Sequence, residues 1–255
     1  MERLLELVDA GAREVRFVVR EGCVAQEALR SVGLSRPGVA RAFARGSVLR
    51  DGRALAAGTR LRAGEKISLA LVRTREARHG RPRGVAAGGG VDVVYEDRFV
   101  VAVDKPAGLL VHSDGRDVET LTDRVQTWAD ERGYDCAVQA LQRLDVETTG
   151  VTLFSLTEEF QPAFDELVAG HGMRKRYLLE VAAGFPEGER WIEAPIGRDR
   201  HDARRMRVSR TGKPSRTLVR KLGERGGRAL LLAELATGRR HQIRVHLASM
   251  GFPLA

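Results

Sequence analysis

Apolar residues recur along the chain at two spacings, one typical of helices and one typical of strands. The helical spacing predicts helices over residues 24–32, 37–44, 119–132, 158–169 and 238–251. Gly33, Gly46 and Gly251 offer C-terminal caps, and Ser35 offers an N-cap to the second helix. Residues 191–222 are expected to be loop-rich and basic. Runs rich in β-branched residues predict strands over 91–97, 99–112, 151–156, 177–182 and 228–235.

The predicted strands and helices alternate irregularly along most of the chain. This order favours an α+β fold with a mixed, mostly antiparallel sheet. Between residues 74 and 90, glycine, proline and arginine replace the periodic apolar positions, which predicts a flexible linker. We therefore expect a small N-terminal α/β domain at 16–73, the linker at 74–90 and a larger domain at 91–255.

Charge is distributed unevenly. Residues 1–90 carry 18 lysines and arginines against 9 aspartates and glutamates, which accounts for the whole formal charge of +9. Residues 91–170 carry 6 basic and 17 acidic side chains, and residues 171–255 carry 19 and 8. This segregation predicts a basic module and a basic surface in the last third, both suited to a polyanion such as nucleic acid. For any single arginine, a solvated surface cation is the alternative.

Composition argues against several other classes of protein. Hydrophobic residues make up 43% of the chain, enough for a packed core, and no run approaches the roughly 18 apolar residues of a membrane helix. The first residues are amphipathic and acidic rather than an apolar signal segment, so we expect a soluble, cytoplasmic protein. Cys23 and Cys136 lack metal or disulfide spacing, and His241 and His246 have no carboxylate at metal spacing. No metal site is expected.

Two distant segments carry the side chains best suited to chemistry. QRLDVETTG holds a lone Asp145 among an arginine, small hydroxyl residues and a glycine, and TGRRHQIRVH contains three arginines, the last of them Arg244. If folding brings Arg244 against Asp145, the guanidinium would keep the carboxylate ionised and fix its direction. Such a carboxylate is a nucleophile or base that needs no metal. An aspartate that caps a turn is the alternative.

The N-terminal third resembles a known RNA-binding module. The run GLSRPGVARAFARGSVLRDGRAL, followed by LRAGEKISL, resembles the module named after ribosomal protein S-four, and the fit covers residues 16–72. A generic helix-turn-helix is the alternative. Arginines on its charged face would contact phosphates, which position a duplex without reading its sequence. The RNA-binding residues expected there are Arg36, Arg41, Arg45 and Arg50.

The rest of the chain, from residue 91 onward, resembles the pseudouridine synthases of the RluA type. Four segments carry the resemblance in the expected order: DKPAGLLVH at 104–112, QRLDVETTG at 142–150, RKRYLLEV at 174–181 and TGRRHQIRVH at 237–246. One segment alone would be weak evidence, whereas four in order are a specific signal. The resemblance implies an isomerase, an intramolecular transferase that converts specific uridines of structured RNA to pseudouridine and needs no cofactor.

The resemblance also implies roles for individual residues. Asp145 is the expected catalytic residue, with Tyr177 packed on the uracil and Arg244 paired with the carboxylate. Arg143 is expected to enter the RNA and help hold the target nucleotide out of its stack. The other substrate-binding residues expected from these motifs are Gly150, His241 and Gln242. Each residue has a plainer alternative in a turn, a core position or a solvated surface.

The sequence departs from the family pattern at several points. Gln142 replaces the usual histidine, Thr149 a usual serine and Ser113 a common proline. Glutamine and threonine keep hydrogen-bonding capacity, so these changes do not predict a loss of activity. Relatives continue with further strands beyond the position of Ala255, so we expect a catalytic domain that is shortened or incomplete at its C-terminus, with apolar sheet surface exposed.

Two other functional classes stay open. A catalytically silent RNA-binding or ribosome-assembly factor would share the module but would form no pseudouridine. A methyltransferase with the same module needs a glycine-rich loop after a strand, whereas the glycine cluster at 88–90 precedes a strand. The partner is expected to be ribosomal or transfer RNA, without a membrane, and the protein is expected to be a monomer.

Overall fold

The structure is a computed structural model that describes residues 3–10, 14–71, 90–115, 117–134, 136–170, 172–200, 202 and 205–255. The predicted linker at 74–90 lies outside the described residues except for residue 90. In the described part of the chain every strand pairing is antiparallel, and helices accompany each of the three larger sheets. The predicted α+β class with mostly antiparallel sheets is therefore confirmed. None of the described helices is long and apolar enough to span a membrane.

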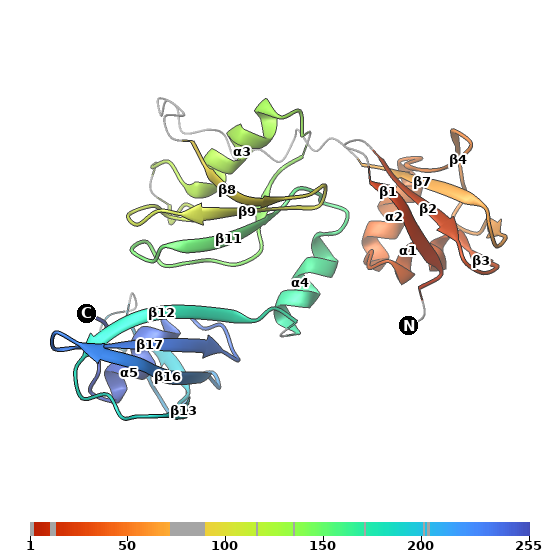
Figure 1. Ribbon diagram of the computed structural model, residues 1–255. Coiled ribbons are helices and arrows are strands. Elements are labelled where there is room, and N and C mark those ends of the chain that lie inside the picture. The colour runs from red at the N-terminus through yellow and green to blue at the C-terminus, as the bar shows by residue number, and fades with distance from the viewer. Residues whose placement is uncertain are drawn as a thin grey trace. The chain divides into compact units, whose positions relative to one another are not determined.

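The chain forms two compact units, Met1–Val168 and Ala169–Ala255, called here the first and second units. The first unit contains two sheets of five and four strands, and the second unit contains one larger sheet of four strands (Figure 1). The boundary between the units falls inside the region that the sequence assigns to the larger domain.

The N-terminal sheet has the strand order β1-β2-β7-β4-β5. Its strands are β1 Leu5–Ala10, β2 Glu14–Val19, β7 Lys66–Ala70, β4 Val48–Arg50 and β5 Arg53–Ala54. The sheet thus begins upstream of residue 16. A short pair, β3 Cys23–Val24 with β6 Arg60–Leu61, and two helices, α1 Ala25–Ser31 and α2 Arg36–Ala44, complete this module.

The predicted helical pair of this module is present. The Ser35 hydroxyl accepts a hydrogen bond from the Gly38 amide at 3.1 Å, so the predicted N-cap of α2 is confirmed. Gly33 and Gly46, which follow the two helices, both have positive φ angles. The core beneath the helices includes Leu29 and Leu69, which are fully buried.

The second sheet of the first unit has the strand order β10-β11-β9-β8. Its strands are β10 Gln139–Ala140, β11 Gly150–Ser155, β9 Val100–Lys105 and β8 Asp92–Glu96. Helix α3, Leu121–Glu131, begins at a capping box formed by Thr120 and Asp123. Helix α4, Gln161–Ala169, begins later than predicted. The apolar face predicted for α3 is buried as expected, at Leu121, Val125, Trp128 and Ala129.

The sheet of the second unit has the strand order β12-β17-β16-β13. Its strands are β12 Lys175–Ala182, β17 Arg228–Leu235, β16 Arg216–Arg225 and β13 Glu189–Glu193. A separate hairpin joins β14 Ile196–Arg198 to β15 Met206–Val208. The prediction of a loop-rich segment over 191–222 is therefore wrong. On β16 the polar Thr217 is buried and the apolar Leu222 is exposed, so polarity does not follow the period of a strand.

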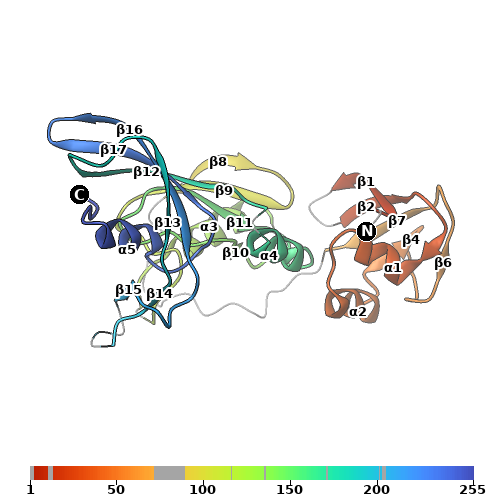
Figure 2. The same ribbon diagram turned by 90° about the horizontal axis from the view of Figure 1, so that it is seen from below.

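Helix α5, Gln242–Ser249, lies against one face of this sheet (Figure 2). The core between them contains Val181, Val219, Leu231 and Leu247, all fully buried. The helix begins at Gln242 rather than at residue 238. The preceding His241 has a φ of +56°, which lies outside the helical region and delays the helix start.

Candidate active site

The loop between β10 and β11 carries the predicted catalytic aspartate. Asp145 is half-buried, and its backbone carbonyl accepts a hydrogen bond from the Thr148 amide at 3.0 Å, which closes a turn. The Val146 carbonyl accepts a hydrogen bond from the Gly108 amide at 3.0 Å. Gly150, at the start of β11, has a φ of +115°, a conformation that side chains rarely adopt. Backbone contacts therefore hold the loop in a defined shape.

A buried lysine joins this loop to the segment that follows β9. Lys105, the last residue of β9, is fully buried. Its ammonium group donates hydrogen bonds to the carbonyls of Pro106 at 2.8 Å, Leu109 at 2.7 Å and Val146 at 2.8 Å. Burial lowers the pKa of Lys105, and the carboxylates of Glu147 and Asp145 act in the opposite direction. The three carbonyl dipoles replace the water that the ammonium has lost.

A cavity of about 330 Å³ lies beside the Asp145 loop in the first unit. Thr149 of the loop lines it together with Lys105 and Pro106, and Arg124 of α3 lines another side. Its volume is at the lower end of the range of about 300–1,000 Å³ that small-molecule sites occupy.

Arg143 and Gln142 precede Asp145 on the same loop. The Arg143 side chain is exposed, whereas the Gln142 amide donates a weak hydrogen bond of 3.4 Å to the Val151 carbonyl. Burial lowers the pKa of His112, and the positive charge of Arg143 adds to this effect. The charge of Arg143 therefore acts on His112 at the edge of the site.

In the second unit, one buried amide organises the TGRRHQIRVH segment. Gln242 is almost fully buried, and its oxygen accepts hydrogen bonds from the Arg239 amide at 3.0 Å and the Thr237 hydroxyl at 2.8 Å. Its nitrogen donates to the Arg216 carbonyl at 3.0 Å and the Thr217 hydroxyl at 2.9 Å. The turn before α5 is thus tied to strand β16. Both polar atoms of this amide are bonded to other parts of the protein. Gln242 therefore has a structural role, in which it holds the turn against β16.

His246 extends this network into the core. Its imidazole is fully buried, with Nδ1 2.9 Å from the Thr217 hydroxyl and Nε2 3.0 Å from the Ala194 carbonyl. A carbonyl can only accept, so Nε2 carries the proton, and Nδ1 accepts the hydroxyl proton of Thr217. The Thr217 oxygen in turn accepts from Gln242. Burial lowers the pKa of His246, in agreement with a neutral ring.

The remaining site residues of the second unit lie on the same side of its sheet. Tyr177 on β12 is half-buried and packs against the core that α5 covers. Arg244 lies in the first turn of α5, just after His241, and is exposed. Asp145 belongs to the first unit, so the contact between Asp145 and Arg244 stays a prediction.

The predicted RNA-binding arginines lie on α2 and at the end of β4. Those on α2 are exposed, whereas Arg50 pairs with Glu65 at 3.1 Å. An exposed arginine cluster on one helix is a suitable contact for phosphates. The three exposed residues are Arg36, Arg41 and Arg45.

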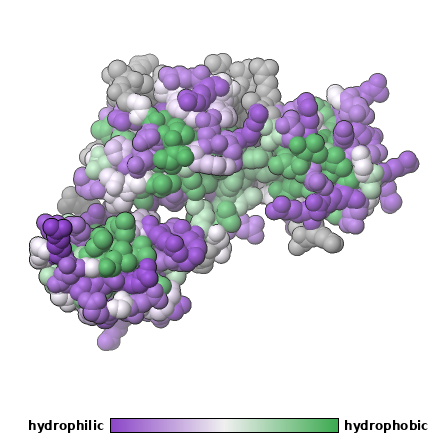
Figure 3. All heavy atoms as spheres, in the orientation of Figure 1, coloured by the Kyte–Doolittle hydropathy of each residue, from purple (hydrophilic) through white to green (hydrophobic). Residues whose placement is uncertain are grey.

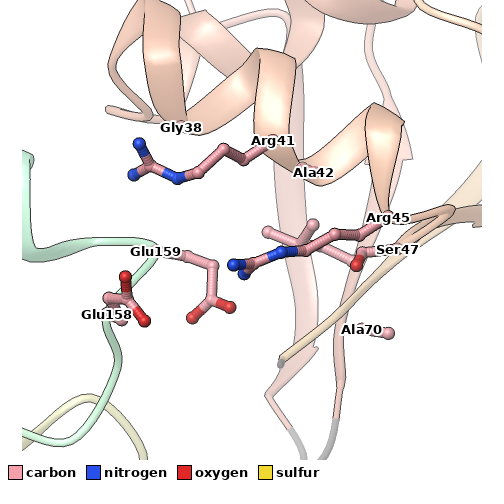
Figure 4. A pocket seen from close by; sticks show the side chains of 9 residues that line it. Gly38, Arg41, Ala42, Arg45, Ser47, Ala70, Glu158 and Glu159 are labelled. Atoms are coloured by element: carbon pink, nitrogen blue, oxygen red, sulfur yellow. The ribbon is translucent and has the colours of Figure 1, made fainter. Parts of the chain in front are cut away.

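Two of these arginines face acidic side chains of the same unit. Figure 4 shows Arg41 and Arg45 directed toward Glu158 and Glu159 across a cavity of about 20 Å³. Phe160, the next residue, is buried within the core cluster of the N-terminal module. The segment before α4 is thus packed against the module, which explains why both belong to one unit.

Sequence reasoning missed the two polar groups that organise these loops. Lys105 stands inside a recognised motif, but a lysine normally indicates a solvated surface cation. From the sequence, His246 was considered only as a metal ligand, and that role was rejected. The signal that could have revealed Lys105 is its position at the end of an otherwise apolar strand, directly before a proline turn.

Residues 99–249 match the family described as RNA pseudouridylate synthase. The match covers more than half of the chain, and it includes both organised loops. The protein belongs to the RNA pseudouridylate synthase family.

Individual relatives agree with this assignment. A protein named ribosomal large subunit pseudouridine synthase D from Nitrosomonas europaea is 37% identical over 164 residues, which cover 64% of this chain and 47% of the relative. An uncharacterized RNA pseudouridine synthase from Chloroflexus aurantiacus is 35% identical over 224 residues, which cover 87% of this chain and 69% of the relative. The chain spans about half the length of several curated relatives that it matches.

A solved structure shares the fold. Human RNA Pseudouridylate Synthase Domain Containing 1 superimposes with a TM-score of 0.56 at 22% identity, which covers 67% of this chain and 69% of that chain. At this level of identity the likeness concerns the fold alone.

Replacing Lys105 by methionine should destabilise the first unit. The substitution leaves three carbonyls without their donor, and we expect a loss of about 3 kcal/mol in the free energy of unfolding. Urea unfolding followed by circular dichroism measures this loss. The matched control is Lys66→Met at an exposed position, which should change the midpoint little. Equal midpoints for the two variants would contradict the anchoring role.

Stability should depend on pH through His246. Its pKa in the folded protein is lowered, so the unfolded chain takes up the proton first as pH falls below about 6.5. The free energy of unfolding should therefore decrease with falling pH, by up to about 1.4 kcal/mol per unit for this group. His246→Gln should be less stable at pH 7.5 but should show a shallower decrease toward pH 5.5. Parallel curves for the variant and the wild type would refute this.

Proposed function

We propose that the protein is an RNA pseudouridine synthase that isomerises specific uridines with Asp145 as its catalytic carboxylate. The observation that supports this most strongly is the anchoring of the Asp145 loop by Lys105, within the segment that matches the family. A relative's name refers to the large ribosomal subunit, which favours ribosomal RNA over transfer RNA as the substrate. An RNA substrate of this kind would place the protein in the cytoplasm.

The chemistry needs few groups. The glycosidic bond from ribose carbon to uracil nitrogen breaks, the uracil turns within the pocket, and the same ribose carbon bonds to a ring carbon. That ring carbon loses its proton, and the freed ring nitrogen gains one. No atom is gained or lost overall and no electron is transferred, so a carboxylate in an enclosed site is sufficient. Asp145 acts as the nucleophile or as the base in this scheme.

The other residues act around this carboxylate. In this proposal Arg244 acts as the cationic partner of Asp145, because a nearby guanidinium favours the ionised carboxylate. Tyr177 packs on the uracil, and Arg143, exposed on the loop, helps hold the flipped nucleotide. Gly150 leaves the backbone accessible to the nucleotide. His241 and Gln242 contribute through the turn that presents Arg244.

The N-terminal module supplies affinity in this proposal. Its exposed arginines on α2 contact phosphates and orient the RNA without reading its sequence. The basic second unit adds a further electropositive surface. The two basic regions together guide a structured RNA toward the Asp145 loop.

Asp145→Asn should abolish pseudouridine formation while RNA binding persists. Loss of a catalytic nucleophile or base costs at least about a thousandfold in rate, whereas one neutralised carboxylate changes phosphate contacts little. Pseudouridine in a transcript of ribosomal RNA, mapped at single-base resolution, measures turnover, and filter binding measures affinity.

The matched control for this experiment is Asp165→Asn, the same chemical change on helix α4 of the same unit. It should retain wild-type turnover. Pseudouridine formation by Asp145→Asn at the wild-type rate would refute the catalytic assignment, and wild-type protein that binds RNA but forms no pseudouridine would favour a silent binding factor.

Removing Arg41 and Arg45 together should weaken RNA binding and reduce its salt dependence. Each lost phosphate contact lowers the slope of log affinity against log salt concentration by about 0.9, because fewer counterions are released. Binding titrations between 50 and 200 mM salt, roughly the range in which this effect is large, measure the slope. Arg20→Ala, whose arginine pairs with Glu6 at 3.4 Å, is the control. An unchanged slope in the double variant would mean that other surfaces bind the RNA.

A further inference from the structure

The segment that ends at His112 is bound to the start of helix α3. The Leu110 carbonyl accepts a hydrogen bond from the Leu121 amide at 2.7 Å. The Val111 carbonyl accepts one from the Thr122 amide at 3.1 Å, and the Val111 side chain is buried in the core that α3 covers. His112 therefore follows a fixed stretch of backbone, although the residue itself is exposed.

One hydroxyl group determines which nitrogen of His112 carries the proton. The Thr122 hydroxyl lies 2.6 Å from the Val111 carbonyl and 3.1 Å from Nδ1 of His112. A carbonyl can only accept, so the hydroxyl donates its proton to Val111, and Nδ1 donates to the hydroxyl oxygen. Nε2 of the neutral ring is then unprotonated and can only accept a hydrogen bond.

This acceptor is available to a ligand. Among the residues that the structure describes, Nε2 of His112 has no hydrogen-bond partner. Desolvation and the charge of Arg143 lower the pKa of His112, against the opposing charge of Asp123, so the ring is neutral at about pH 7. Figure 3 shows mainly hydrophilic residues over α3, which suit a polar ligand better than an apolar one.

Arg143 provides the complementary group. Its guanidinium can only donate, the residue is exposed, and its charge acts on the His112 ring. A donor near an acceptor matches one unit of the RNA backbone. In that unit the phosphate oxygens accept hydrogen bonds, and the ribose 2′-hydroxyl is a donor that DNA lacks.

We propose that Nε2 of His112 accepts a hydrogen bond from a ribose 2′-hydroxyl of the bound RNA, beside a phosphate held by Arg143. This contact rests on the proposed function, because Arg143 meets RNA only if the Asp145 loop does. It gives His112 a role in substrate binding and in the selection of RNA over DNA. Base amines are the other donors in RNA, but they lie on base edges, whereas the hydroxyl belongs to the same backbone unit as the phosphate.

Single 2′-fluoro substitutions in a synthetic fragment of ribosomal RNA test this contact. Fluorine keeps the sugar conformation of RNA but has no proton to donate. In a filter-binding scan, substitution at one position should weaken binding to the wild type about threefold to tenfold, the effect of one lost hydrogen bond. A scan in which no position weakens binding, or in which only the removal of a base amine does so, overturns the proposal.

Variants of His112 show whether the sensitive hydroxyl meets this residue. His112→Phe keeps a ring without an acceptor, so it should bind unmodified RNA about threefold to tenfold more weakly, and the 2′-fluoro substitution should then cause no further loss. His112→Gln, whose amide oxygen can accept, should recover most of the affinity. Independent losses that multiply in His112→Phe overturn the contact.

The binding scan needs no turnover, so it separates this contact from the proposed function. A wild type that forms no pseudouridine refutes the proposed function. A scan without a sensitive position, obtained with an active wild type, refutes the His112 contact alone.

Discussion

The buried ammonium group of Lys105 is the interaction on which the first half of the candidate site depends. It draws together carbonyls from the turn after β9 and from a loop that lies 41 residues further along the chain. A charge in this position is tolerated only while all its partners are present, because an unpaired buried charge costs several kcal/mol. The end of strand β9, through Lys105, therefore fixes the position of the Asp145 loop.

In the second unit, neutral side chains rather than a charged one hold the turn before α5 in place. Gln242, Thr217 and His246 form a chain of hydrogen bonds that ends at the Ala194 carbonyl. Each group donates where its neighbour accepts, so the polar side-chain atoms of Gln242, Thr217 and His246 all have hydrogen-bond partners. The segment that carries Arg244 is thereby fixed within its own unit. The Asp145 loop and the Arg244 segment are thus each preorganised by contacts within their own unit.

Much of the fold could be predicted because local signals and packing agree. The capping box and apolar face of α3, and the Ser35 cap of α2, appear in the structure as the sequence indicates. Strands β13 to β16 were missed because apolar and polar residues do not alternate cleanly along them; on β16 the polar Thr217 is buried and the apolar Leu222 is exposed. Strand β12 was predicted, but its leucines occur on both faces, so the periodicity could not indicate which of them solvent would reach.

The candidate site was predictable to a different extent. Asp145, Tyr177 and Arg244 stand within motifs, so a family resemblance identifies them one by one. Lys105 and Gln242, which hold the motifs in place, also stand within them, but the resemblance does not indicate that either is buried. Lys105 and Gln242 are polar residues that statistics assign to the surface, and only the folded chain shows that both are enclosed. Sequence therefore identifies the proposed reacting groups more readily than the buried residues that position them.

The left-handed conformation of His241 has a consequence for variation at this position. Valine, isoleucine and threonine fit that region of backbone space poorly, whereas glycine and asparagine enter it easily. Among the described residues other than glycine, only Asp51 shares a positive φ. The residue types tolerated at position 241 are therefore limited first by the backbone conformation and only then by the chemistry of the side chain. The set of substitutions tolerated at position 241 would therefore reflect the backbone conformation as much as the function of the imidazole.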